Sequence, residues 1–354
     1  MTDDRFPFEP LAGGLREAWQ EPLPAERLRK LRRAAHTTRE LLLAEGPVQA
    51  CVTARLVTFP YPTVYAFLGG ALSPAPFVMM TNRMQVVQFQ HVGKTKTLLF
   101  NPSDYERNKA ATFYADLSAK FGKLLSERVF PTYFGQVPEQ LARLNLRPED
   151  VDFIAYDHLH VQDLRGWLGS KPLFPNAKLL VMKREWDSVR DLHPMNSVWY
   201  VPGGLEGISS DRVIFLDGDV RLGPGLAILS TPGHTVGNMS LVVVTPDGPF
   251  VVSENGVACE SYTPLQSQIP GVRSYAERMG YEVVLNGNTR EDSLDQYSSM
   301  VVEKIVAGPA KDDPTFVAFC PSSELTASIL APGLKPTFSF RPPEVGTLLP
   351  TTRG

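Results

Sequence analysis

The chain has 354 residues, of which 43% are hydrophobic and 21% charged, the composition of a globular protein with room for one large domain or two modest ones. A net charge of −3 gives no basic excess, and no apolar run reaches the roughly 18 residues of a membrane span, so neither nucleic acid nor a membrane is an expected partner. Three scattered cysteines and a start without the pattern of a secretory signal predict a cytoplasmic protein free of disulfides.

The first predicted element is a helix over residues 25–45, where leucines recur at helical spacing among many charges and Gly46-Pro47 ends the pattern. This helix precedes everything that has the character of the core domain, so we assign residues 1–47 to an N-terminal helical extension. Two interpretations remain open. The helix either packs on its own domain or forms a contact in a homo- or hetero-oligomer.

Strands follow the extension. Alternation from Val48 to Leu56 predicts the first strand, and residues 77–89 and 95–100 predict a hairpin that turns near Gly93-Lys94. Residues 104–146 are predicted to be mainly helical. The short apolar run at 151–157, VDFIAYD, is typical of a buried strand.

The second half repeats this alternation of strands and helices. Its clearest signal is a hairpin, SLVVV then TPDG then PFVVS, over residues 240–253. The other predicted elements are strands at 177–182, 212–215, 226–230 and 315–320 and helices at 272–280 and 291–307. The pattern favours a layered α/β architecture, with the proline-rich residues 331–354 as a tail laid along the surface or loose.

Three of the six histidines stand in turns beside predicted strands. His158 and His160 form a His-x-His pair after the apolar strand, where both imidazoles can turn toward one point, and His234 lies at the tip of a Pro-Gly turn. Imidazole nitrogen is a good ligand for zinc or iron. Taken alone, the pair also fits surface histidines, and His234 fits an ordinary turn residue.

The two segments together resemble a known family. Residues 231–241, TPGHTVGNMSL, resemble the Thr-Pro-Gly-His-Thr-x-Gly-x-x-Ser segment of the metallo-β-lactamase superfamily. VDFIAYDHLHVQDLRG falls where that superfamily has a strand followed by His-x-His-x-Asp-His-x-Gly-Gly. The resemblance covers roughly residues 48–330, which we assign to one domain, and it implies an α/β fold, a four-layer αββα sandwich with metal at one edge of its two sheets.

The resemblance implies that His158, His160 and His234 are the ligands of the first metal. The ligand positions of a second metal are all altered. Gln162 stands for an Asp, Asp163 for a His, Asn255 (beside Glu254) for the bridging Asp and Ser323 for the last His, and Asn101-Pro102-Ser103 replaces an early Asp-x-Gly turn. We therefore expect one metal per chain, zinc first, with iron or manganese as alternatives.

A metal held by three histidines keeps an open position and lowers the pKa of a bound water to about 7. Asp163 is expected to orient or deprotonate that water, or to serve as a fourth ligand; its other interpretation is a capping or salt-bridged carboxylate. Asn255 is expected to donate a hydrogen bond to an anionic intermediate, or else to be a turn residue. Tyr156 and Asp157 adjoin the motif and are expected to steer an imidazole.

The segment 190–202, RDLHPMNSVWYVP, lies where related folds carry an inserted loop over the metal. Trp199 and Tyr200 are predicted to wall an apolar pocket that binds aromatic groups, and His193 is a candidate lining residue or replacement ligand. The alternative is that the two rings pack a long loop onto the core.

These expectations favour a metal-dependent hydrolase that activates water against a small organic substrate such as a lactone, ester, aryl ether or aryl halide. One alternative is a mononuclear iron oxygenase, which the replacement of Asp by Asn255 disfavours. The other is a non-catalytic paralogue that serves as a partner subunit. Retention of three histidines argues against it.

Overall fold

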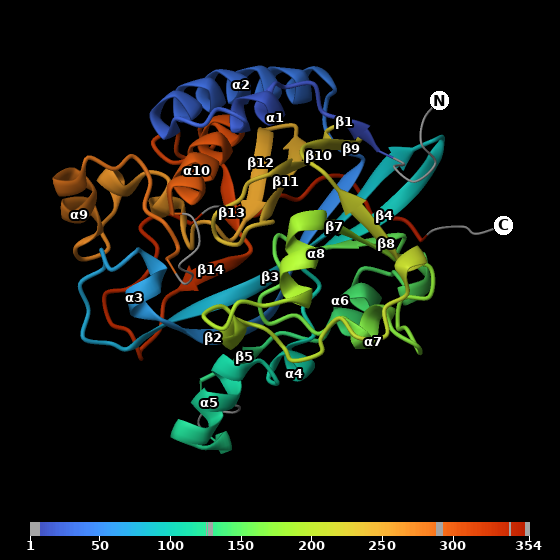
Figure 1. The fold of residues 1–354 in the computed structure, drawn as a ribbon, viewed down its shortest axis with the longest axis horizontal. Helices are drawn as coiled ribbons and strands as arrows, with labels where there is room; N and C mark the ends of the chain where they lie inside the picture. The colour runs from blue at the N-terminus through green and yellow to red at the C-terminus, as the bar shows by residue number, and fades with distance from the viewer. Residues whose placement is uncertain (1–7, 125, 127–129, 288–292, 340, 351–354) are drawn as a thin grey trace.

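Two β-sheets pack face to face with helices on both outer sides (Figure 1). A computed structural model describes residues 8–124, 126, 130–287, 293–339 and 341–350. The first residues of the helix predicted at 291–307 lie outside this part of the chain. Among the described residues, the two sheets are formed by strands from both halves of the sequence, so the predicted alternation builds one sandwich.

The first sheet has the order β1-β9-β10-β11-β12-β13. Its strands are β1 Glu9–Pro10, β9 Val220–Gly223, β10 Leu226–Ser230, β11 Met239–Thr245, β12 Gly248–Ser253 and β13 Phe319–Pro321. The predicted hairpin is β11 and β12, paired antiparallel from Leu241 opposite Val252 to Thr245 opposite Gly248. The edge strand β13 runs parallel to β12.

The second sheet has the order β5-β2-β3-β4-β6-β7-β8, with β14 also paired to β3. Its strands are β2 Ala50–Pro62, β3 Phe77–His91, β4 Lys94–Phe100, β5 Thr132–Tyr133, β6 Phe153–Ala155, β7 Lys178–Met182, β8 Val213–Leu216 and β14 Ser323–Thr326. Strands β4, β6, β7 and β8 are parallel neighbours, so the β6 end that precedes the His-x-His pair lies inside the sheet rather than at its edge.

Helices connect these strands and cover them. They are α1 Leu15–Trp19, α2 Pro24–Ala44, α3 Thr63–Ala66, α4 Tyr105–Asn108, α5 Thr112–Phe121, α6 Val137–Arg143, α7 Arg165–Leu168, α8 Lys183–Arg190, α9 Val272–Met279 and α10 Ser293–Ala307. Residues 104–146 are less regular than expected, since short helices flank the added strand β5.

The four layers follow from the period-two alternation of the strands. On β11, Leu241 and Val243 face the core between the sheets, whereas Val242 and Val244 face α2 and α10. Successive strand side chains point to opposite faces, so a strand that is apolar on both faces has to be covered on both. The observed architecture is the predicted αββα sandwich.

The N-terminal helix α2 packs on the first sheet beside α10 (Figure 1). Leu31, Ala35 and Leu42 are buried in the core that these helices share with the sheet. The C-terminal tail is also held against the sandwich. Val345 pairs with Cys51 through two backbone hydrogen bonds, so the described part of the tail around this residue lies along the sandwich.

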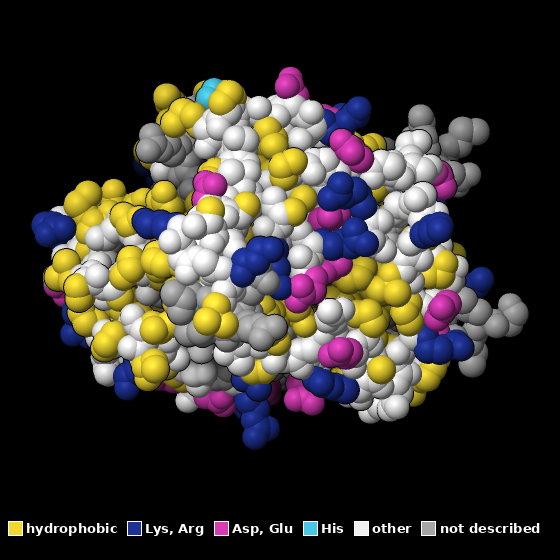
Figure 2. All heavy atoms as spheres, turned by 90° about the horizontal axis from the view of Figure 1, so that it is seen from below, with side chains coloured by type: hydrophobic (Ala, Val, Ile, Leu, Met, Phe, Trp, Pro, Cys, Tyr) yellow, Lys and Arg dark blue, Asp and Glu magenta, His cyan; other side chains and the backbone are white. Residues whose placement is uncertain are grey.

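The surface opposite α2 mixes charges of both signs with scattered hydrophobic side chains (Figure 2). No described helix is both long and apolar enough to cross a membrane. All three cysteines are buried and unpaired, as the sequence predicts.

Candidate metal centre

The three predicted histidines sit on two loops that meet where the sheets end. His158 and His160 follow β6 of the second sheet, and His234 lies between β10 and β11 of the first. A backbone hydrogen bond of 2.8 Å from Met239 N to Asp157 O ties the two loops together. Gly233 is required in the His234 loop, because its φ is +130° and a Cβ there would lie 2.1 Å from the backbone nitrogen of Gln296.

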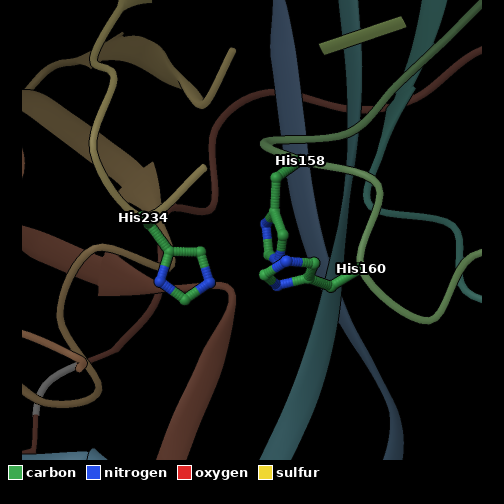
Figure 3. Close-up of side chains that lie close together, drawn as sticks. All are labelled: His158, His160 and His234. Carbon is green, nitrogen blue, oxygen red and sulfur yellow. The ribbon is translucent and has the colours of Figure 1, made fainter. Parts of the chain in front are cut away.

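The structure brings the three rings together. Ring centroids are 4.6 Å apart for His158 and His160 and 4.5 Å apart for His158 and His234. One nitrogen of each ring lies within 4.8 Å of one nitrogen of the other two. Figure 3 shows His158 and His160 side by side and His234 facing them. All three side chains are buried.

Asp157 orients the first of these rings. Its Oδ1 lies 2.8 Å from His158 Nδ1. Its Oδ2 accepts from the Asn101 amide at 3.1 Å and from the Ser322 hydroxyl. A ring that donates Nδ1–H to a carboxylate presents Nε2 as the metal ligand, which is the usual arrangement of metal-binding histidines. The Asn101 turn, which stands for the family's Asp-x-Gly, therefore holds the carboxylate that orients His158.

Burial and charge set the protonation of the three rings differently. Burial lowers the pKa of His158, but the Asp157 carboxylate outweighs burial and raises that pKa to about 9. Burial, with the charge of His158 added, lowers the pKa of both His160 and His234. Two buried neutral imidazoles beside one carboxylate-paired imidazole form a donor set suited to a divalent ion.

His160 provides a direct test of whether a metal fits. Both of its ring nitrogens are buried and, among the described residues, neither has a hydrogen-bond partner. A buried polar nitrogen without a partner costs free energy, about 1–3 kcal/mol, unless a ligand satisfies it. The residues present therefore fit a metal ion bound by His158, His160 and His234.

A carboxylate that the sequence analysis gave only a minor role lies beside this cluster. One oxygen of Glu254 lies within 4.8 Å of a ring nitrogen of His158 and of an Asp157 oxygen. Its Oε2 accepts from Ser323 Oγ at 3.1 Å. Burial raises the pKa of Glu254 to about 7, against the opposing charge of His158. Glu254 is thus the partly buried carboxylate that faces the histidines.

The structure places Asp163 elsewhere. Its carboxylate forms a two-point ion pair with Arg165, with Nε to Oδ1 at 2.9 Å and Nη2 to Oδ2 at 2.7 Å. It belongs to neither described group that could hold a metal, and it does not line the pocket beside the histidines. This ion pair matches the other interpretation of Asp163, a salt-bridged carboxylate, and a role of Asp163 at the metal stays a prediction. Both carboxylate oxygens are taken by Arg165, which stands two residues further along the loop.

Asn255 has no N–H left for the expected contact with an anionic intermediate. Its Nδ2 donates to Glu303 Oε1 at 2.8 Å and to the Thr231 carbonyl at 3.3 Å. Glu303 is fully buried and also accepts from Ser240 and Tyr262. In this structure a buried carboxylate and a carbonyl accept from both N–H groups of the Asn255 amide, and the expected donor role stays a prediction.

Of the three residues singled out in the loop 190–202, Trp199 is the one that lines the pocket. Trp199 lines a pocket that opens beside the cluster, and its ring centroid lies 6.1 Å from that of His160. Tyr200 is buried against His160, at 4.8 Å between centroids, but does not line the pocket. His193 is exposed, accepts a hydrogen bond from Met195 N and lies outside both the pocket and the histidine cluster.

Sequence reasoning missed Glu185, a fully buried residue of α8. Its Oε1 accepts from Leu159 N at 2.8 Å, and its Oε2 accepts from Thr235 Oγ1 at 2.7 Å. These partners adjoin His158, His160 and His234, so one carboxylate joins both metal-binding loops. Gly237 allows this approach, because a Cβ there would lie 2.3 Å from Glu185 N. An acidic residue within the sequence KREW gave no local signal of this contact.

Known proteins resemble the chain over part of its length. No protein-family profile matches it. An N-acyl homoserine lactonase from a Bacillus species is 27% identical over 135 residues, which is 37% of this chain and 50% of the relative. The N-acyl homoserine lactonase AttM of Rhizobium radiobacter is 30% identical over 119 residues, 31% of this chain and 42% of the relative. The chain thus spans half the length or less of these relatives.

Among solved structures, a probable metal-dependent hydrolase from Staphylococcus aureus overlaps with a TM-score of 0.48 at 14% identity, covering 73% of this chain and 84% of that one. An overlap of this degree does not define a shared fold by itself. The fold is defined instead by the layers, the order of the strands and the loops that carry the histidines. With the similarity to the lactonases, they identify this chain as a protein of the metallo-β-lactamase fold.

Proposed function

We propose that the protein is a metal-dependent hydrolase that opens the ester bond of a lactone or a related small ester. The observation that carries the proposal is the convergence of three buried histidines at a pocket that also contains Glu254. The curated relatives are N-acyl homoserine lactonases, which act on a cyclic ester. A pocket that reaches the histidines favours catalysis over the alternative of a non-catalytic partner subunit.

His158, His160 and His234 would hold the ion, and we propose zinc at one ion per chain because nitrogen ligands at an open three-histidine site suit it. A bound divalent ion supplies Lewis acidity toward the scissile carbonyl and lowers the pKa of water beside it. Asp157 orients the His158 ring, so that Nδ1 donates to the carboxylate and Nε2 would be left to bind the ion.

Glu254 is the residue that we assign to proton transfer. Ser323 engages Oε2, which leaves Oε1 to accept a hydrogen bond from the attacking water. The water oxygen bonds to the carbonyl carbon and its proton passes to Glu254. The proton then moves to the leaving oxygen as the C–O bond breaks. General bases of this kind contribute about 10²–10⁴-fold in rate.

The test compares two histidine variants. His160→Ala removes a proposed ligand, and we expect it to lower both zinc content and hydrolysis of δ-valerolactone or an N-acyl homoserine lactone by more than about 100-fold. His193→Ala is the matched control, because this histidine is exposed and lies outside the cluster. Elemental analysis and a lactone-opening assay give the two readouts. Unchanged zinc content in His160→Ala would refute the site.

A further inference from the structure

Aromatic side chains are prominent among the residues that line the pocket beside the histidines. Those that line it belong to Phe59, Tyr61, Tyr105, Tyr114, Tyr133 and Trp199. They come from β2, from the segment around α4, α5 and β5, and from the loop before β8. Trp199 stands closest to the metal site, with its ring 6.1 Å from that of His160.

Several of these rings pack on other rings. Tyr61, Tyr65 and Phe113 surround Trp199 at centroid distances of 6.4, 5.9 and 4.8 Å. Tyr114 packs edge-to-face on Phe59 at 6.2 Å. A site built from packed rings favours a rigid, flat ligand over a flexible chain, because the flexible chain loses more conformational freedom on binding.

The charges in the pocket argue against an anionic ligand. Lys109 is the one lysine or arginine among the described lining residues, and it already pairs with Glu106 at 2.7 Å. Asp157 and Glu254 also line the pocket, so it carries carboxylates next to the histidines. An uncharged ligand meets no repulsion there.

We propose that the substrate is uncharged and carries an aromatic ring within one or two bonds of the scissile ester or lactone, with Trp199 and Tyr114 binding that ring. This inference rests on the proposed hydrolase function and names its substrate class. Aromatic pairs gain attraction beyond the burial of area, through the quadrupole of each ring. A saturated ring of the same size buries similar area without that gain.

The experiment therefore compares phenylacetamide with cyclohexylacetamide, two uncharged amides used as unreactive probes, by calorimetric titration of the metal-loaded protein. We expect phenylacetamide to bind about five- to tenfold more tightly. In parallel, methyl phenylacetate and methyl cyclohexylacetate are compared as substrates, and kcat/KM should differ in the same direction. The binding measurement does not depend on turnover.

Variants place the preference on the named rings. Tyr114→Leu should reduce the preference for phenylacetamide to about twofold or less. Tyr281→Leu is the matched control, because its ring packs on Tyr275 and Tyr297 outside the pocket. Trp199→Leu provides a second test nearer the metal, provided that its circular dichroism and melting show a folded protein.

The outcomes separate the two claims. Equal affinity for the phenyl and cyclohexyl probes, or no binding of either, overturns the inference even if both esters are hydrolysed. A phenyl preference that Tyr114→Leu removes supports it. If the protein prefers the phenyl probe but hydrolyses neither lactones nor esters, the proposed function is overturned. The aromatic specificity of the pocket is then still supported.

Discussion

At the scale of single residues, the role of each carboxylate near the histidines depends on which partners its oxygens already contact. Asp157 uses both oxygens to hold His158, Asn101 and Ser322, so it positions a ligand. Asp163 is engaged by Arg165, whereas Glu254 has one oxygen bound to Ser323 and faces the histidines. The sequence offers Asp157, Asp163 and Glu254 as acidic candidates, but only their contacts in space distinguish a positioning residue, an ion pair and a candidate base.

The Asp163–Arg165 pair predicts a pH dependence of stability. Burial raises the pKa of Asp163, but hydrogen bonds and charge from Arg165 outweigh burial and lower it. A carboxyl group whose pKa is lowered by folding adds stability that is fully present above its unfolded pKa of about 3.9. That stability is lost as the pH falls through the lower folded pKa. Asp163→Asn should therefore be less stable than the parent at pH 7, and the difference should shrink below about pH 4.

The expected difference at pH 7 is about 1 kcal/mol, because Arg165 is 37% exposed and solvent screens the pair. Urea unfolding of metal-free protein between pH 7 and pH 3.5 measures it. Asp187→Asn, in an exposed pair with Lys183, is the control and should change stability little at any pH. A difference that grows toward acid pH would contradict the assignment.

At the scale of elements, the local sequence pattern predicted that strands exist more accurately than it predicted the residues at which they begin and end. The hairpins 77–100 and 240–253 are confirmed because alternation and turn residues are local signals. The last strand, predicted at 315–320, is instead the short β13 Phe319–Pro321 followed by β14 Ser323–Thr326. The chain crosses from one sheet to the other at Ser322, since β13 pairs with β12 and β14 with β3. That crossing is decided by tertiary pairing, which a window of sequence does not contain.

The role of helix α8 was also missed, because Glu185 contacts residues that are distant in the sequence. The next prediction concerns this helix. Glu185→Leu removes the acceptor for Leu159 N and Thr235 Oγ1, and a buried donor left without a partner costs about 1–3 kcal/mol. The two histidine loops then lose their common anchor. We expect lower stability together with zinc affinity reduced about 10–100-fold, the range found for residues that orient metal ligands.

Asp187→Leu, on the same helix but with an exposed side chain, is the matched control and should stay within about 0.5 kcal/mol of the parent. Competition with a zinc chelator and thermal melting of the metal-free protein measure the two effects separately. Wild-type zinc affinity in a folded Glu185→Leu protein would show that Glu185 has only a structural role.

At the scale of the whole molecule, the four altered positions contact residues from several distant parts of the chain. All four substituted positions have identified partners. Gln162 donates to Ser103, Asp163 pairs with Arg165, Ser323 donates to Glu254 and Asn255 donates to Glu303 of α10. The resemblance implied that the ligand positions of a second metal are altered, but the sequence did not show which contacts the side chains at those positions make. We therefore expect that restoring one ligand residue does not restore a second metal site.

Asn255→Asp tests this directly. The substitution recreates the family's bridging carboxylate but sets it against Glu303, whose Oε1 lies 2.8 Å from Asn255 Nδ2. Burial already raises the pKa of Glu303, and its hydrogen bonds from Ser240, Tyr262 and Asn255 oppose that rise. Replacing one donor by a second carboxylate therefore adds repulsion in a buried site.

We expect elemental analysis to find about one zinc per chain in the parent protein and in Asn255→Asp. We expect Asn255→Asp to melt at a lower temperature than the parent. In the double variant Asn255→Asp with Glu303→Gln, the new carboxylate regains a donor, so much of the lost stability should return, and the two changes should be strongly non-additive. Two zinc ions per chain in the single variant would show instead that the second site was lost only through its ligands, and that the network around Glu303 does not exclude it.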